Sequence, residues 1–112
     1  MVNYHLISQI SLGDEEFLKT VLHQYKDISK DFLEKSLELT KEKKWSLLHL
    51  RLISYRDKIA HLLNKPSLNR VNAVLEIMQS SLNSSAKLKA YNELISRIKK
   101  EMTYIESSQA VS

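Results

Sequence analysis

The chain has 112 residues with one glycine, one proline and no cysteine, and 43% of its residues are hydrophobic. This composition leaves little material for turns and no thiol for disulfides or metal sites, so it predicts a single all-α domain, residues 1–112, of long helices joined by short loops. The net charge is +4, but acids interrupt the lysine clusters and no dense basic stripe is present, which argues against nucleic-acid binding. We also find no signal peptide and no apolar run of the roughly 20 residues that a membrane span needs, so we expect a cytoplasmic protein that binds no membrane.

The first predicted element is a short helix, Tyr4 to Ser11, in which Tyr4, Ile7 and Ile10 are spaced on one helical face. It ends before Gly13, because glycine adopts left-handed backbone geometry without steric cost. Asp14 is then the expected N-cap of a second helix, with Glu15 and Glu16 in the first turn complementing the helix dipole.

The second helix carries an apolar stripe of Phe17, Leu18, Val21, Leu22, Tyr25 and Ile28. Ser29 or Asp31 is a candidate cap for a third helix, whose expected inward residues are Phe32, Leu33, Leu37 and Leu39. No strong breaker separates the two segments, so one long helix with a kink is the alternative. Lys41 to Lys44 then form the connection to the next helix.

The next helix opens at Trp45, and its apolar residues recur at steps of three and four: Trp45, Leu48, Leu52, Tyr55, Ile59 and Leu62. It must end or bend before Pro66, since proline cannot donate to the helical ladder. Ser67 is a candidate cap for the following helix, whose inward residues are Leu68, Val71, Val74 or Leu75, and Met78.

A polar run from Ser80 to Ser85 predicts a loop with capping residues. The last helix follows, with inward positions at Leu88, Tyr91, Leu94 or Ile95, Ile98, Met102 and Ile105. We expect residues 107–112 to be frayed, which leaves a core of about residues 4–105. These amphipathic helices with short connections predict an antiparallel four-helix bundle with an additional short N-terminal helix.

Two features at matching spacing resemble the histidine-containing phosphotransfer (HPt) family. The run Gly13-Asp14-Glu15-Glu16-Phe17 is similar to the start of such domains, and Trp45 stands where the family has a tryptophan eight residues before its phosphoacceptor histidine. Tyr55 takes the family's apolar position and Arg56 its lysine position. The resemblance covers roughly residues 4 to 105 and is closest from Gly13 to Leu63. It implies a bundle of HPt type in a bacterial two-component phosphorelay, with a response-regulator receiver domain or a histidine kinase as partner.

Two departures from the family pattern concern the same chemical step. Ile53 stands at the phosphoacceptor position, and an alkyl side chain has no nucleophile to take a phosphoryl group. Asp57 stands where the family has a glycine or serine that lets an acidic receiver pocket approach, and its carboxylate should repel that pocket. The sequence therefore predicts a degenerate, non-enzymatic adaptor or regulator. Its expected partner-binding surface consists of His49, Leu50, Ile53, Arg56 and Asp57.

Two alternatives remain open. An active phosphotransfer protein would use His49, one turn before Ile53, or His61, whose surrounding residues 60–65 imitate the family's motif. His49 is also explained as a residue at the edge of the core, and Pro66 argues against His61 because the family's helix continues past its histidine. The second alternative is a helical scaffold or homodimerisation module.

The face of the Trp45 helix opposite its core stripe includes Leu47 and Leu50, with Ile53 nearer the flank. These three would form an exposed apolar cluster unless the N-terminal segment or a neighbouring helix covers Leu47. We expect no metal, because His5 and His23 lack partners at ligand spacing. No cofactor is expected either, since a chain with one glycine has no glycine-rich phosphate loop.

Overall fold

The computed structural model describes residues 1–111, without the side chains of residues 10, 11 and 108–111. Five α-helices and one short 3₁₀ turn follow one another, and in the described part of the chain the only β-type pairing is an isolated bridge between Val2 and Leu63. The predicted all-α class is confirmed. The elements are α1 (Tyr4–Ser11), α2 (Glu15–Lys41), α3 (Trp45–Ile59), η1 (Ala60–Leu62), α4 (Lys65–Gln79) and α5 (Ser84–Val111).

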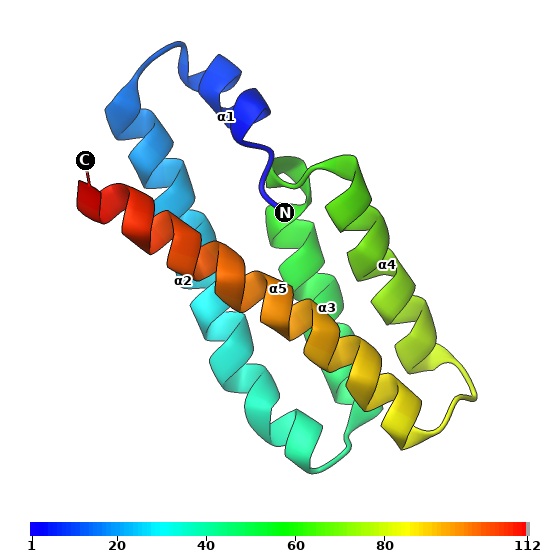
Figure 1. The fold of residues 1–112 in the computed structure, drawn as a ribbon. Coiled ribbons are helices and arrows are strands. Elements are labelled where there is room, and N and C mark those ends of the chain that lie inside the picture. Colours follow the sequence, from blue (N-terminus) through cyan, green and yellow to red (C-terminus); the bar gives the residue numbers. More distant parts are fainter. Residues whose placement is uncertain (112) are drawn as a thin grey trace.

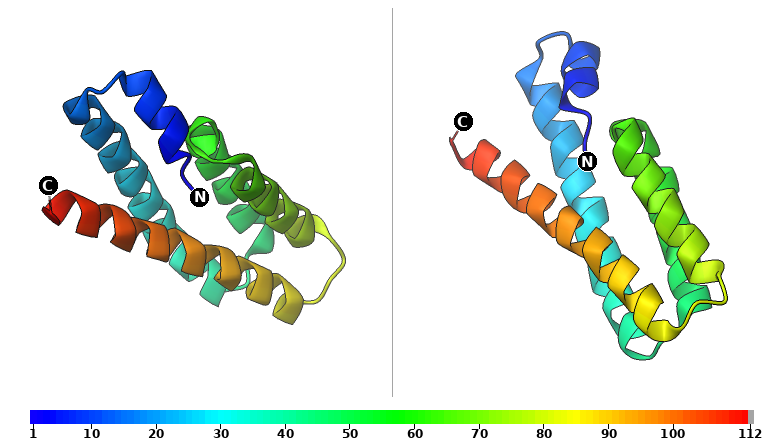
Figure 2. Two further views of the ribbon diagram at one scale, coloured as in Figure 1. Left: turned by 45° about the horizontal axis from the view of Figure 1, so that its top comes forward. Right: turned by 45° about the vertical axis from the view of Figure 1, so that its right-hand side comes forward.

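The four longer helices form a closed ring of contacts. Helix α2 packs against α3, α3 against α4, α4 against α5, and α5 returns to α2, while the short α1 packs on α2. Each long helix runs opposite to the one before it, and α5 crosses obliquely over α2 and α3 (Figure 1). The turned views show the same arrangement, with α3 and α4 side by side (Figure 2). The result is a helical bundle 47 Å long.

The junction of α1 and α2 follows the sequence signals closely. Leu12 and Gly13 both adopt positive φ angles, 52° and 82°, which ends α1. The Asp14 carboxylate accepts hydrogen bonds from the backbone N–H groups of Glu16 (3.1 Å) and Phe17 (3.2 Å). The predicted N-cap of α2 is therefore confirmed.

Helix α2 is one continuous helix of 27 residues. Neither Ser29 nor Asp31 starts a new helix. Ser29 is buried inside α2, and so is Ser36, whose hydroxyl donates to the Phe32 carbonyl at 2.6 Å. Because the helix does not restart, its buried residues follow one another at steps of three and four along a single face: Leu22, Tyr25, Ser29, Phe32 and Ser36.

Two residues expected to face inward from α2 do not. Leu37 is 57% exposed and Phe17 is 43% exposed. Leu37 follows buried Ser36 directly and so points about 100° away from the core stripe. The expectation for Leu37 assumed a restarted helix, whose phase would have been different.

The connection from α3 to α4 bends before the proline, as predicted. Helix α3 ends at Ile59, η1 follows, and Pro66 lies in the first turn of α4. The cap of α4 is Asn64, whose side-chain oxygen accepts from the Ser67 N–H at 3.0 Å. Ser67 was predicted as the cap and is instead a buried residue of the first turn. Proline is tolerated early in a helix because N–H groups there have no helical acceptor, so the helix begins before Pro66 rather than after it.

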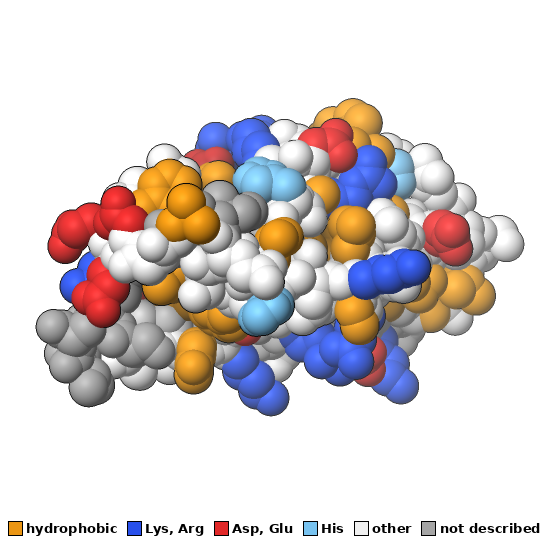
Figure 3. All heavy atoms as spheres, turned by 90° about the horizontal axis from the view of Figure 1, so that it is seen from above, with side chains coloured by type: hydrophobic (Ala, Val, Ile, Leu, Met, Phe, Trp, Pro, Cys, Tyr) orange, Lys and Arg blue, Asp and Glu red, His pale blue; other side chains and the backbone are white. Residues whose placement is uncertain are grey.

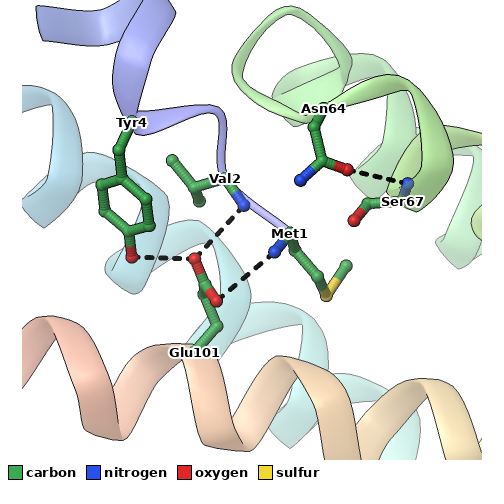
Figure 4. A network of polar contacts seen from close by, with 6 residues as sticks. All are labelled: Met1, Val2, Tyr4, Asn64, Ser67 and Glu101. Carbon is green, nitrogen blue, oxygen red and sulfur yellow. Dashed lines mark hydrogen bonds and ion pairs between the residues drawn. The ribbon is translucent and has the colours of Figure 1, made fainter.

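The N-terminal segment closes one side of the bundle. The Asn3 N–H donates to the Leu62 carbonyl (2.6 Å), and the Asn64 N–H donates to the Met1 carbonyl (2.9 Å). Figure 4 shows how Glu101 of α5 gathers three donors from this segment: the Tyr4 hydroxyl at 2.8 Å, the Val2 N–H at 3.2 Å and the Met1 amino group at 3.5 Å. This segment therefore ties α5 to the junction of η1 and α4.

The last predicted loop is shorter than expected, since α5 begins at Ser84. The Asn83 side chain accepts from the Ala86 N–H at 2.9 Å, so the polar run does supply a cap. Helix α5 continues to Val111 and includes most of the tail expected to fray, while Ser112 lies outside the described residues. Within residues 1–111, no helix is both long and apolar enough to cross a membrane.

Candidate functional site

The orientation of α3 is fixed by its buried stripe. Leu48, Leu52, Tyr55 and Ile59 are all buried, and Trp45 at the first position is partly buried. The indole N–H of Trp45 donates to the Ser84 hydroxyl at 3.2 Å, which ties the start of α3 to the start of α5. Since one face of α3 is committed to the core, the opposite face is presented outward.

Tyr55 is the polar anchor of this stripe. Its ring stacks on Phe32 of α2, with centroids 4.4 Å apart and planes 9° apart. Its hydroxyl lies 2.7 Å from the Ser29 hydroxyl in a buried hydrogen bond. Burial raises the pKa of Tyr55 to about 12. These contacts hold α3 against α2 at one rotation, and that rotation determines where Ile53 and Asp57 lie.

The five residues predicted as a partner-binding surface differ in accessibility. Leu50 is 61% exposed, and Asp57 is also exposed. Ile53 is half-buried and packs against the core cluster, so it presents only part of its side chain. His49 is 8% exposed and belongs almost entirely to the interior. The accessible part of the predicted surface is therefore Leu50, the outer part of Ile53, Arg56 and Asp57.

Arg56 is held in place by two neighbours. Its Nε and Nη2 atoms each lie 3.1 Å from the Asp57 Oδ1 atom, and its Nη1 donates to the Asn72 side-chain oxygen of α4 at 3.2 Å. The ion pair is largely exposed and adds about 1 kcal/mol or less to the free energy of unfolding. Its effect is geometric: the guanidinium lies against α4, and the Asp57 carboxylate stays one turn beyond Ile53.

Leu47 and Leu50 both keep about half or more of their side-chain surface exposed. Leu47 is 48% exposed. The N-terminal segment, one of the two covers considered for Leu47, instead pairs with Leu63 at the far end of α3. The predicted apolar cluster thus retains two exposed leucines, while Ile53 belongs in part to the core.

These leucines stand between two grooves. The first is lined by Leu39, Leu47, Leu50, Arg51 and Ser54. The second, which we name the basic groove, lies where α3 begins, α4 ends and α5 begins. Its lining includes Lys43, Lys44, Trp45, Leu47, Leu50 and Lys87. No carboxylate lines it among the described residues. A hydrogen bond from Lys44 to Glu42 beside the groove raises the pKa of that ammonium, so Lys44 stays charged.

The remaining histidines lie outside this face. His61 is exposed in η1, beyond the end of α3. His5 is exposed on α1, and His23 pairs with Asp27 of the same helix at 3.3 Å. Among the described residues, no cluster of three or more histidine, cysteine or acidic side chains is arranged to hold a metal ion.

The sequence did not indicate Asn72 or Ser29 as partners of this region. Asn72 fixes Arg56 from α4, and Ser29 fixes Tyr55 from α2. A polar residue inside an otherwise apolar stripe, as Ser29 is, was the one available signal. Comparison with known proteins adds nothing to this picture: no family model, curated protein or solved structure matches the chain.

Proposed function

We propose that this protein is an HPt-like signalling domain of a bacterial two-component pathway that carries no phosphoryl group and acts by binding a receiver domain or a histidine kinase. The proposal is supported by the spacing of the Gly13–Phe17 run, Trp45 and Ile53 in the sequence. It is also supported by the order of elements, in which a short helix is followed by a long α2 and then by an α3 that begins at Trp45. The bundle would then be a four-helix bundle of HPt type.

The observation that carries the proposal is the pairing of Ile53 with Asp57 on the outward flank of α3. A phosphoacceptor must present a nucleophile, and Ile53 offers only a half-buried alkyl group. The Asp57 carboxylate is exposed one turn later and is held there by Arg56. An acidic, metal-loaded receiver pocket would therefore meet a negative charge and no acceptor, so contact would lead to binding without transfer.

The histidines give weaker support to a phosphotransfer function. His49 is buried, whereas a phosphoacceptor must be reached in line by a large partner. His61 is exposed but lies in a 3₁₀ turn directly before buried Leu62 and Leu63, not on a continuous helix. Leu50, by contrast, is exposed beside Ile53 and offers an apolar anchor for a partner.

The first experiment asks whether the chain accepts phosphate. The protein is incubated with a phosphodonor histidine kinase and with a phosphorylated receiver domain, and acid-labile phosphate is measured. We expect none. Labelling that disappears in His49→Ala or in His61→Ala would refute the proposal and identify an active phosphotransfer protein.

The second experiment asks whether this face binds. Titration calorimetry measures the affinity for the same receiver and kinase in the wild type, in Leu50→Glu and in the control Leu37→Glu, which places the same charge at an exposed leucine of α2. We expect Leu50→Glu to weaken binding at least about tenfold, because an apolar anchor is replaced by a charge that must be desolvated. Binding that Leu50→Glu leaves intact would rule out this docking face, and failure to bind any kinase or receiver would count against the function itself.

A further inference from the structure

The basic groove combines exposed leucines with cationic side chains. Leu47 and Leu50 are exposed on α3, and Lys43, Lys44 and Lys87 line the same groove. Among the described residues, neither Lys43 nor Lys87 has an ion-pair partner; Lys44 is paired with Glu42. An occupant that matches this groove must bring an apolar side chain and carboxylates together.

The opposite end of the molecule carries that combination. Leu12 is 91% exposed and Phe17 is 43% exposed, and Glu15 and Glu16 lie between them. No ion pair of either glutamate is present within residues 1–111. We name these four residues the acidic tip. Viewed from above, acidic side chains gather with hydrophobic ones at the end of the molecule where α1 meets α2 (Figure 3).

Leu12 is also unusual in its backbone. Its φ of 52° lies in the left-handed region, which is unfavourable for a leucine and costs nothing to a glycine. A nearly fully solvated leucine in this conformation stabilises neither the turn nor the core. Its side chain is thus available for a contact with another molecule.

The acidic tip and the basic groove cannot meet within one molecule. They lie at the two ends of α2, whose 27 residues span about 40 Å (Figure 1). We propose that the protein associates head to tail: the acidic tip of one copy inserts Leu12 and Phe17 into the basic groove of a second copy, with Glu15 and Glu16 facing its lysines. This self-association goes beyond the proposed function and does not depend on it.

A contact of this kind joins two different surfaces, so it leaves one tip and one groove unoccupied in every dimer. Further copies therefore add to the ends, and the assembly grows with concentration instead of stopping at two. The contact is small and charged, so we expect a dissociation constant of about 10 µM to 1 mM and weaker association at high salt.

The test uses sedimentation velocity of the full chain over about 10 µM to 1 mM, the affinity range expected for a small interface. The tip variant is Leu12→Gly, which removes the exposed leucine side chain. Glycine adopts the left-handed backbone conformation of residue 12 without steric strain, so the fold is retained. The groove variant is Leu47→Glu, at a half-exposed position. Leu37→Glu, on an exposed part of α2 outside both surfaces, is the control.

We expect the wild type and Leu37→Glu to form growing oligomers that dissociate in high salt. Leu12→Gly and Leu47→Glu should each remain monomeric. An equimolar mixture of these two variants should form a one-to-one dimer and nothing larger, because it contains one functional tip and one functional groove.

The proposal would be overturned if the wild type, or the mixture of the two variants, stayed monomeric at every concentration. It would also be overturned by a closed dimer that Leu12→Gly does not affect, or by a groove that binds a surface other than the acidic tip. The last would be seen as association lost in Leu47→Glu but retained in Leu12→Gly. Because Leu50 belongs to both surfaces, kinase or receiver binding is measured below about 10 µM, where the wild type is expected to be monomeric. At that concentration Leu12→Gly, far from Ile53, should leave this binding unchanged, so failure here is distinct from failure of the proposed function.

Discussion

The proposed function predicts that a histidine and a glycine placed on α3 at the positions of the HPt pattern convert the protein into a phosphoacceptor. The change is Ile53→His combined with Asp57→Gly. Most of the Ile53 side chain is buried, so its replacement forfeits most of the 1.5–3 kcal/mol that full burial of such a side chain contributes, or roughly 2 kcal/mol. Asp57→Gly costs a few tenths of a kcal/mol in helix propensity and up to about 1 kcal/mol in the exposed ion pair with Arg56. The total of about 3 kcal/mol is smaller than the 5–15 kcal/mol that typically stabilises a domain, so the variant should fold.

The assay compares phosphoryl transfer from a receiver to three variants whose helical content is verified by circular dichroism. Ile53→His alone should remain a poor acceptor, because Asp57 still places a negative charge beside the site. Such a charge at contact distance costs about 1 kcal/mol or more, so we expect the double variant to react about tenfold faster or better. Ile53→Ala with Asp57→Gly is the matched control and should take no phosphate.

Two results would refute this reasoning. Equal rates for Ile53→His and the double variant would show that Asp57 does not obstruct the approach. A folded double variant that binds a receiver yet takes no phosphate would show that position 53 is not the acceptor position.

Three further predictions concern stability. Burial raises the pKa of Tyr55 to about 12 and also raises that of Tyr25, so the stability that these neutral hydroxyls contribute is complete below the ordinary value of 10 and declines as the pH rises above it. Tyr55 alone contributes about 3 kcal/mol, so the urea midpoint followed by circular dichroism should fall between pH 10 and pH 12. A urea midpoint that is the same at pH 12 as at pH 9 would contradict the assignment. Asp14→Ala should lower the free energy of unfolding by about 1 kcal/mol in urea titrations, through loss of the α2 cap, and an unchanged midpoint would show that the cap contributes nothing. Leu52→Ala should cost about 2–5 kcal/mol in the same titration, while the half-exposed control Leu47→Ala should cost about 1 kcal/mol or less. Similar losses for the two would show that α3 is oriented differently.

The parts of the fold predicted correctly are those decided by near neighbours in the chain. The bounds of α1, the Asp14 cap and the bend before Pro66 each depend on interactions within about four residues. Such interactions are available in the sequence, since capping and proline geometry do not need the rest of the molecule. The inward stripe of α3 was equally predictable from its spacing.

The errors and omissions have non-local causes. The inward position predicted for Leu37 depends on a helix that begins at Ser29, whereas Ser29 is buried against Tyr55 of another helix. The N-terminal segment pairs with Leu63 and with Glu101, about 60 and 100 residues away, and no short-range signal marks such contacts. At the candidate site, helical spacing located Ile53 and Asp57 on the flank of α3. It did not show how deeply His49 is buried, because that depends on the neighbouring helices.

The buried pair of Ser29 and Tyr55 has a consequence for the uniqueness of the bundle. Apolar side chains are not directional, so α2 could slide along α3 by one turn, about 5.4 Å, and rebuild many of its contacts with other leucines. The same slide would separate two buried hydroxyl groups, each costing about 1–3 kcal/mol when left unsatisfied. This single hydrogen bond thus sets the register between α2 and α3, and with it the axial position of Ile53 and Leu50 relative to α2. A Ser29→Ala, Tyr55→Phe protein could keep its helices and still lose the fixed outline that a partner recognises.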